Sequence, residues 1–148
     1  MEIIKPQRAQ REQRAQRLNS SLSQDEFPLK DITEKIIAGA IEVHTALGPG
    51  LLESVYEKAL AYEFELRSIK HERQKSINLM YKGKDIGKHI IDFLVEDEVI
   101  VELKAVDTFH DIFQAQVLTY LKAMNKRVGL LINFNVPRLK DGIKRLIV

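Results

Sequence analysis

Two carboxylates and a lysine near the middle of the chain could do chemistry together. Asp92 lies in residues 86–95, which alternate as a strand, and Glu102 and Lys104 lie in the next strand, residues 99–104. Residues two apart in a strand share a face, so Glu102 and Lys104 point the same way. Adjacent carboxylates repel one another unless a cation lies between them. Magnesium or manganese, which prefer oxygen ligands, would resolve the repulsion. Such a metal, with a lysine that stabilises negative charge, can hydrolyse phosphodiesters.

The length of one loop decides whether this site can exist. If residues 96–98 form a three-residue loop, Val95 faces Val99 and Asp92 lies opposite Glu102, with Cβ atoms roughly 5 Å apart. A two-residue loop would turn Asp92 to the other face of the sheet, because a slip of one residue inverts a strand. By themselves, an aspartate and a Glu-x-Lys pair also fit an ordinary solvated strand with alternating charges.

Two helical pairs could support the site. Gln116 and Tyr120 are four residues apart, so both project from one face of a helix and could orient metal ligands, the lysine or a phosphate. They also fit an ordinary amphipathic helix boundary. Glu53 and Tyr56 lie near the start of another helix. Glu53 is either a first-turn acid that complements the helix dipole or a further ligand or water holder.

Other catalytic chemistries find little support. The chain has no cysteine, which excludes disulfides, thiolate zinc sites, iron–sulfur clusters and a cysteine nucleophile. The four histidines lack metal-ligand spacing, which argues against a zinc hydrolase. His44 lies near a predicted helix end, where a structural role is at least as favourable as a catalytic one. By strand alternation Ile91, Phe93 and Val95 share one face, and Ile90, Asp92 and Leu94 share the other. His89 falls on the face of Ile91 rather than that of Asp92, which argues against it as a ligand.

The hydrophobic periodicity predicts a single α/β domain at residues 29–148, preceded by an arm. Residues 1–28 repeat Gln-Arg-Ala-Gln-Arg with almost no apolar residues, so we expect a flexible basic and polar arm. The domain should follow the order ααβββαββ. The predicted helices are residues 29–47, 51–67 and 108–125, and the predicted strands are residues 71–81, 86–95, 99–104, 128–134 and 143–148.

Charge is unevenly distributed along the chain. The net charge is +2, but residues 122–148 carry seven basic groups and one acidic group. A basic segment beside an acidic middle suits a polyanion such as DNA, although a solvated surface with clustered lysines gives the same pattern. The candidate phosphate-binding residues are Lys122, Lys126, Arg127, Arg138, Lys140, Lys144 and Arg145. No apolar run approaches the roughly 20 residues that span a bilayer, and no secretory signal is visible, so we expect a cytoplasmic protein without a membrane partner.

The sequence also resembles a known family. Gly50-Leu51-Leu52-Glu53-Ser54-Val55-Tyr56 is similar to the Gly-x-x-Glu-x-x-Tyr signature of the GxxExxY proteins, a family that resembles a branch of the PD-(D/E)XK nucleases. The resemblance covers about residues 30–148. Its further segments, in order, are His44 and Gly48, Ile91-Asp92, Val101-Glu102-Leu103-Lys104, Gln116 with Tyr120-Leu121-Lys122, and Gly129-Leu130-Leu131-Ile132-Asn133-Phe134. The Gln-x-x-x-Tyr helix resembles that of RecB-like exonucleases.

The resemblance implies a restriction-endonuclease-like core, a mixed β-sheet flanked by helices. It implies that Asp92 and Glu102 bind magnesium or manganese, that Lys104 assists the nucleophilic water and that Glu53 is a helix carboxylate feeding the site. Gln116 and Tyr120 would be the supporting pair. Phe113 departs from the pattern, since a histidine is expected three positions before Gln116.

We therefore predict a metal-dependent nuclease acting on nucleic acid, preferably DNA. The alternative is a non-catalytic nucleic-acid-binding or assembly protein that retains the nuclease fold. A domain of this size has little room for a separate DNA-recognition module, so a homodimer or a partner subunit could supply one.

Overall fold

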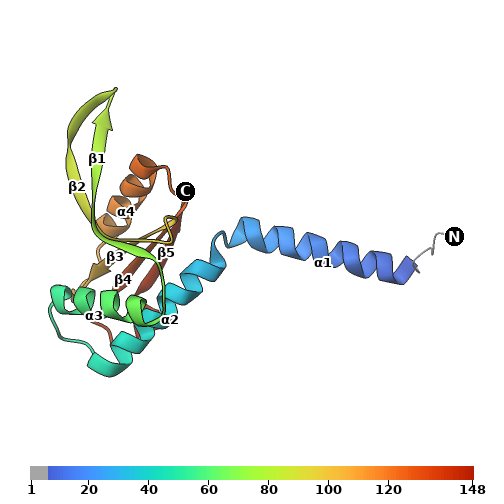
Figure 1. Cartoon of the computed structure of the whole chain (residues 1–148), viewed down its shortest axis with the longest axis horizontal. Helices are drawn as coiled ribbons and strands as arrows, with labels where there is room; N and C mark the ends of the chain where they lie inside the picture. Colours follow the sequence, from blue (N-terminus) through green and yellow to red (C-terminus); the bar gives the residue numbers. More distant parts are fainter. Residues whose placement is uncertain (1–6) are drawn as a thin grey trace. The chain divides into compact units, whose positions relative to one another are not determined.

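The structure, a computed structural model, describes residues 7–148, apart from the side chains of residues 18–26. Contacts divide the chain into two units, Met1–Lys30 and Asp31–Val148, which are described separately. The first unit contains one helix, α1 (Gln7–Glu26), in which Arg8 and Glu12 form an exposed ion pair of 3.1 Å (Figure 1). The predicted arm is thus helical over these residues, and its flexibility stays a prediction. Residues 1–6 of the predicted arm lie outside the described residues.

The second unit has the predicted α/β architecture. Its elements are α2 (Lys30–Leu47), α3 (Glu53–Leu66), β1 (His71–Tyr81), β2 (Lys84–Val95), β3 (Val99–Lys104), α4 (Asp111–Met124), β4 (Val128–Asn133), the 3-10 helix η1 (Leu139–Gly142) and β5 (Ile143–Ile147). Apart from η1, this is the predicted order ααβββαββ. No helix within residues 7–148 combines the length and the apolar character that crossing a membrane requires.

One mixed sheet organises the domain. Its strands lie in the order β1-β2-β3-β4-β5; β3 and β4 are parallel, and every other neighbouring pair is antiparallel. Helix α4 connects the two parallel strands, as such a crossover requires. It packs on one face of the sheet, and α2 and α3 lie on the opposite face (Figure 1). The predicted mixed sheet flanked by helices is confirmed.

Apolar side chains fill both interfaces of the sheet. On the α4 side, Val117, Tyr120 and Leu121 pack against buried residues of four strands, namely Ile77, Ile91, Leu94, Ile100 and Leu131. Gly129 of β4 permits this close approach, because a Cβ atom there would lie 2.7 Å from Val117 Cγ1. On the other side, the ring of Phe64 from α3 packs edge-on against Phe93, with centroids 5.3 Å apart.

Strand β2 changes face close to Asp92. We expected Ile91 and Phe93 to share one face, and the structure shows this to be wrong. Ile91 packs with Leu94 against α4, whereas Phe93 packs against α3. The pairs Arg73↔Phe93 and Lys75↔Ile91 keep one register, but Gln74 between them has a left-handed φ of +53°. The left-handed residue interrupts the regular backbone of β1 next to the point where β2 changes face. The register of the two strands shifts only further out, between Leu79 and Met80.

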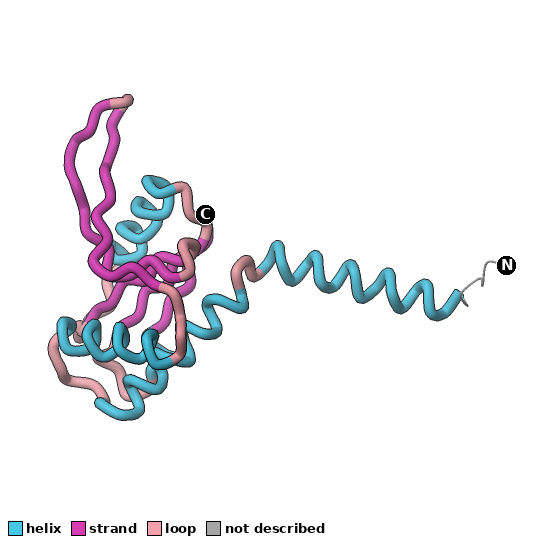
Figure 2. The backbone as a smooth tube through the Cα atoms, viewed as in Figure 1, coloured by secondary structure: helices cyan, strands magenta, loops and turns pink. Residues whose placement is uncertain are grey.

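Beyond this point, β1 and β2 continue as a two-stranded hairpin that turns away from the other strands (Figure 2). Its turn consists of Lys82 and Gly83, with φ of 47° and 81°, and Tyr81 pairs with Lys84. Two consecutive positive φ values are typical of the tight turn that matches strand twist. β2 therefore begins at Lys84, two residues before the predicted strand of residues 86–95.

Candidate active site

The register of β2 and β3 brings the two carboxylates together. Val95 pairs with Val99 and Phe93 with Val101, which confirms the three-residue loop. One pair further along, side chains replace the backbone ladder. The N–H of Asp92 donates to Glu102 Oε1 at 3.0 Å, and the N–H of Leu103 donates to Asp92 Oδ2 at 2.8 Å. Each carboxylate is thus anchored by the backbone of the opposite strand.

The pair carries more negative charge than its surroundings stabilise. Glu102 is only 8% exposed, and burial, together with the charge of Asp92, raises the pKa of Glu102 to about 8. Burial also raises the pKa of Asp92, although the N–H of Leu103 acts in the opposite direction. Without a cation, Glu102 therefore holds a proton more tightly than an ordinary glutamate does. A divalent cation between the carboxylates would displace that proton.

Lys104 lies at the end of β3 with its backbone fixed. Its carbonyl accepts the N–H of Phe134 at 2.9 Å, and Asn133, directly across from it on β4, hydrogen-bonds both backbone groups of Val106. Its Nζ atom lies 4.6 Å from the centroid of the Phe113 ring in the first turn of α4. A cation over an aromatic face is attracted by the ring, so Phe113 steadies the ammonium group.

Glu53 is the first residue of α3. Burial and the negative charge of Asp92 raise the pKa of Glu53, and the positive charge of Lys104 lowers it. The structure thus brings Glu53 within electrostatic reach of the strand carboxylate and the lysine. Tyr56, one turn later, has a structural position: its hydroxyl donates to Gly48 O at 2.6 Å and its ring stacks on Phe134.

The donor set suits a hard cation bound by few protein ligands. Within residues 7–148, no group of three or more acidic or histidine side chains is close enough to share one metal ion. Asp92 and Glu102 form a pair across β2 and β3. Magnesium is commonly held by one or two carboxylates, while water and substrate phosphate oxygens complete its octahedral shell. The two carboxylates therefore fit a magnesium or manganese ion.

A family model described as the PD-(D/E)XK nuclease superfamily matches residues 30–146. The chain belongs to the PD-(D/E)XK nuclease superfamily. This membership supports a nuclease-type function, and nucleases of this superfamily generally use divalent metals such as magnesium or manganese. Among curated proteins, no sequence matches the chain. The narrower resemblance to the GxxExxY proteins and to the RecB-like branch stays a prediction.

Tyr120 lies within electrostatic reach of Asp92 and Glu102, and a histidine that the sequence did not predict lies against it. Burial raises the pKa of Tyr120, as do the charges of Glu102 and Asp92. The Tyr120 ring stacks on His89, with centroids 4.2 Å apart. The sequence argued against His89 as a ligand because it shares a strand face with Ile91. Because β2 changes face near Asp92, the face that carries His89 and Ile91 lies next to α4. Gln116, one turn before Tyr120, is exposed.

The sequence missed Gln74 and Glu57. Glu57 accepts hydrogen bonds from the Arg73 guanidinium at 3.0 Å and from the Gln74 amide. A hydrogen bond from Gln74 also lowers the pKa of Asp92. Gln74 thus links Asp92 to Glu57 of α3. Glu57 lies one helical turn after Glu53, a spacing that could have suggested it, whereas nothing in the sequence marks Gln74.

The predicted phosphate-binding residues are spread over several elements. Arg145 points toward α2, where its guanidinium donates to Thr33 Oγ1 at 2.7 Å, and burial lowers its pKa. Lys126 lies 3.8 Å from Asp97 in the β2–β3 loop. Arg138 and Lys140 border a hollow of about 480 Å³ beside His44. Lys122, Arg127 and Lys144 are exposed. Arg145 is therefore engaged with α2, and phosphate binding by this set stays a prediction.

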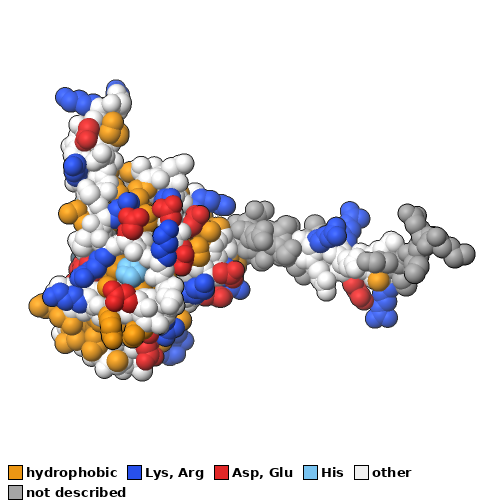
Figure 3. Space-filling view, viewed as in Figure 1, with side chains coloured by type: hydrophobic (Ala, Val, Ile, Leu, Met, Phe, Trp, Pro, Cys, Tyr) orange, Lys and Arg blue, Asp and Glu red, His pale blue; other side chains and the backbone are white. Residues whose placement is uncertain are grey.

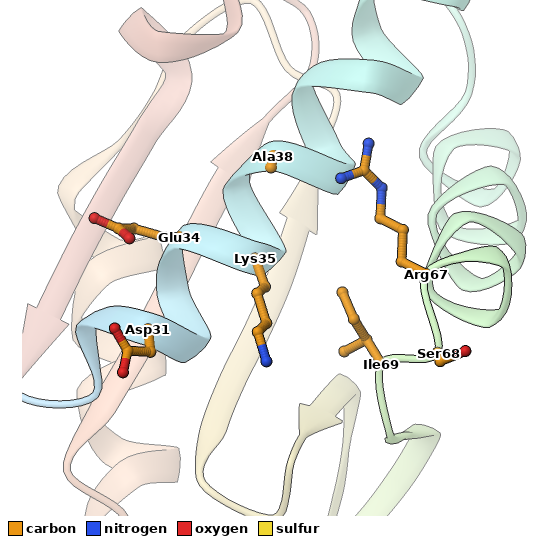
Figure 4. A pocket seen from close by; sticks show the side chains of 7 residues that line it. All are labelled: Asp31, Glu34, Lys35, Ala38, Arg67, Ser68 and Ile69. Carbon is orange, nitrogen blue, oxygen red and sulfur yellow. The ribbon is translucent and has the colours of Figure 1, made fainter.

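A hollow of about 620 Å³ lies away from the carboxylates, between α2 and the C-terminal end of α3 (Figure 4). It is lined by Asp31, Glu34, Lys35, Ala38, Arg67, Ser68 and Ile69. Arg67 is already paired with Glu63 at 2.7 Å. Because none of the candidate catalytic residues line it, this hollow is not the candidate active site.

Proposed function

We propose that this protein is a magnesium- or manganese-dependent nuclease that hydrolyses phosphodiester bonds, with DNA as its preferred substrate. The observation that carries the proposal is the reciprocal anchoring of Asp92 and Glu102 across β2 and β3, with Lys104 two residues further along. Membership of the PD-(D/E)XK superfamily supports the nuclease chemistry. The surplus of basic groups in residues 122–148 supports a polyanionic substrate.

Asp92 and Glu102 would hold the cation. When bound, the ion supplies Lewis acidity and lowers the pKa of a water molecule, so that hydroxide is available at neutral pH. The backbone N–H groups of Asp92 and Leu103 keep both carboxylates oriented before the ion arrives. This pre-organisation limits the reorganisation that metal binding requires.

Lys104 and Glu53 would act on the phosphate and on the attacking water. The attacking water releases a proton to solvent and its oxygen forms a bond to phosphorus, while the bond from phosphorus to the leaving oxygen breaks and the leaving oxygen takes a proton from solvent. The ammonium of Lys104, held over Phe113, would neutralise the negative charge that grows on the phosphate oxygens. Glu53, beside Asp92 and Lys104, would accept a hydrogen bond from the attacking water.

The proposal is tested by incubating the full chain with single- and double-stranded DNA and RNA in the presence of magnesium, manganese or chelator. We expect cleavage that requires the metal and that is faster on DNA. Glu102→Ala and Lys104→Ala should each reduce the rate by orders of magnitude, because each removes several kcal/mol of transition-state stabilisation. Cleavage that persists unchanged in both variants would refute the proposal.

The same assay separates catalysis from binding alone. Salt-dependent binding of nucleic acid without hydrolysis, unaffected by chelator, would favour the alternative of a non-catalytic nucleic-acid-binding protein. Neither binding nor hydrolysis would favour an assembly protein that retains the nuclease fold.

A further inference from the structure

The end of the β1–β2 hairpin is an extended projection of the domain. Residues 80–88, called the hairpin tip below, are all exposed to solvent. Below the tip, Ile77 is buried and packs against α4, and His89 stacks on Tyr120. The hairpin is therefore clamped at its base and unsupported beyond it, as Figures 1 and 2 show.

The hairpin tip exposes large apolar side chains. Met80, Tyr81 and Ile86 are 57%, 60% and 61% exposed. Single apolar residues on a surface are common, but three on nine residues of an isolated ribbon form a patch that water does not stabilise. An isolated two-stranded hairpin gains little stability from its own contacts. The apolar side chains thus indicate a surface that is covered by a partner.

The charge of the hairpin tip identifies the kind of partner. Lys82, Lys84 and Lys88 give three positive charges against the single negative charge of Asp85. The Asp85 carboxylate accepts the N–H of Gly87 at 2.9 Å, so it is engaged within the ribbon. Figure 3 shows basic side chains at the tip with apolar ones beside them. Lysines surrounding apolar and aromatic groups are complementary to phosphates that flank stacked bases.

The hairpin tip belongs to the same strands as the candidate active site. Asp92 lies on β2 and Gln74 on β1, so the ribbon begins at the carboxylates. Lys84 is eight residues from Asp92, which corresponds to about 27 Å of extended strand. This length matches about eight base pairs of duplex, at roughly 3.4 Å for each pair. A duplex whose phosphodiester lies at the carboxylates could therefore also reach the tip.

We propose that the hairpin tip, Met80–Lys88, binds a groove of duplex DNA about one-half to one helical turn from the cleaved bond. A two-stranded ribbon fits the major groove, and apolar ribbon residues can also wedge between base steps in the minor groove. Lys82, Lys84 and Lys88 contact phosphates, and Tyr81 and Ile86 contact bases or sugars. This inference rests on the proposed function, because it assumes that DNA occupies the carboxylate site.

The test compares two triple variants of the full chain that lose the same charge. Lys82→Gln/Lys84→Gln/Lys88→Gln changes the hairpin tip, and Lys35→Gln/Lys58→Gln/Lys70→Gln changes exposed lysines of α2, α3 and the α3–β1 loop. Both are made with Glu102→Gln so that the DNA stays intact. Binding to a duplex of roughly 24 base pairs is measured by fluorescence anisotropy at several salt concentrations. Thermal unfolding verifies that each variant folds.

We expect DNA binding to depend less steeply on salt concentration in the tip variant, and in that variant alone. Each lost phosphate contact should reduce the slope of log K against log salt by about 0.9, so three contacts reduce it by about 2.7. The Lys35/Lys58/Lys70 variant should retain the original slope. A second tip variant, Tyr81→Thr/Ile86→Thr, should weaken binding by about tenfold with the slope unchanged, since it removes apolar contacts only.

Equal slopes for the two triple variants would overturn the inference. So would a tip variant that binds DNA normally but changes the oligomeric state in sedimentation, because the partner would then be a second copy of the chain. Metal-dependent cleavage by the chain without Glu102→Gln is measured separately. Cleavage combined with equal slopes would therefore refute the hairpin inference and leave the proposed function standing.

Discussion

The base and the tip of the β1–β2 hairpin depart from an ordinary protein surface in opposite ways. At the base, the carboxylate of Asp92 lies beside buried Glu102, whose pKa is raised to about 8. At the tip, Tyr81 and Ile86 are about three-fifths exposed to water. The base thus holds charge where solvent is excluded, and the tip holds apolar surface where solvent is not.

Each region lacks a group that would stabilise it, and the chemistry of the region indicates which group that is. Buried carboxylates are stabilised by a cation, and an exposed apolar surface ringed by lysines is stabilised by a polyanion with apolar faces. A metal-bound phosphodiester within duplex DNA would satisfy both regions at once. The two regions share strands but not environment, because Ile77, Leu79 and His89 pack against α4 or its cluster, whereas residues 80–88 are exposed.

The largest effect on the rate of cleavage is expected from a substitution of Asp92 at the base of the hairpin. Asp92→Asn keeps the size of the side chain and an oxygen that can accept the N–H of Leu103, but it removes a negative metal ligand. We expect metal-dependent cleavage to fall by about a thousandfold. The matched control is Asp97→Asn in the exposed β2–β3 loop, which should cleave at the original rate. Equal loss in both variants would contradict a specific role for Asp92.

The next prediction concerns stability against pH. The pKa of Glu102 rises on folding from 4.5 to about 8, so between these values the unfolded chain ionises first. The free energy of unfolding in chelator should therefore fall as pH rises from about 4.5 to about 8 and level off above it. Glu102→Gln removes this loss and should stabilise the metal-free protein above pH 8 by on the order of 2 kcal/mol.

Denaturant unfolding in chelator at several pH values measures this effect. The control is Glu98→Gln, whose carboxylate is exposed in the same loop that joins β2 to β3. A Glu102→Gln protein that follows the same pH dependence as the original chain would show that Glu102 is not the group responsible. If Glu102→Gln gains stability and loses activity, the unfavourable burial of the Glu102 carboxylate is kept for metal binding.

A smaller effect is expected at the irregularity where the hairpin leaves the sheet. Gln74→Asn tolerates the left-handed backbone but shortens the amide that links Asp92 to Glu57. The pKa of Asp92 should rise, so the acidic limb of the activity–pH profile should move to higher pH, and the maximal rate should fall by about tenfold. Asn78→Ser, at an exposed position of β1, should change neither. An unmoved acidic limb would show that Gln74 only shapes the backbone.

The smallest effect should come from the ring beneath the lysine. Phe113→Leu keeps an apolar side chain but removes the aromatic face below Lys104 Nζ. An interaction of about 0.5–1 kcal/mol corresponds to a loss of roughly threefold to fivefold in cleavage rate. Phe113→Tyr should restore the rate, and Phe109→Leu, which alters a neighbouring packed ring, should leave it unchanged. Equal rates in the leucine and tyrosine variants at residue 113 would exclude a role for the ring.

The sequence was sufficient for the parts of the fold that short-range rules determine. The loop of residues 96–98 sets the register of an antiparallel pair, so the position of Asp92 opposite Glu102 followed from counting residues. The lysine two positions after Glu102 followed from strand alternation. Most helix and strand limits agreed to within about three residues. Gly48-Pro49-Gly50 follows the end of α2, and α4 ends at Asn125, which takes a left-handed C-cap conformation.

What the sequence could not give depends on tertiary context. Alternation predicts that Ile91 and Phe93 share a face, but they lie on opposite faces next to the left-handed Gln74 of the neighbouring strand. No glycine or asparagine in the sequence indicates a left-handed residue there. The contact between His89 and Tyr120 follows from the same irregularity. The sequence predicts Arg145 as a phosphate-binding residue. Its hydrogen-bond partner Thr33 lies 112 residues away in sequence, so local patterns could not predict that contact.

Manganese binding is the direct test of whether Asp92 and Glu102 together hold one divalent cation. Titration of manganese into the full chain, followed by electron paramagnetic resonance of the free ion, should reveal one specific site. Asp92→Asn and Glu102→Gln should each abolish that site, whereas Lys104→Ala should retain it, because the lysine acts on the phosphate and not on the metal. Manganese bound with unchanged affinity in both carboxylate variants would contradict the account.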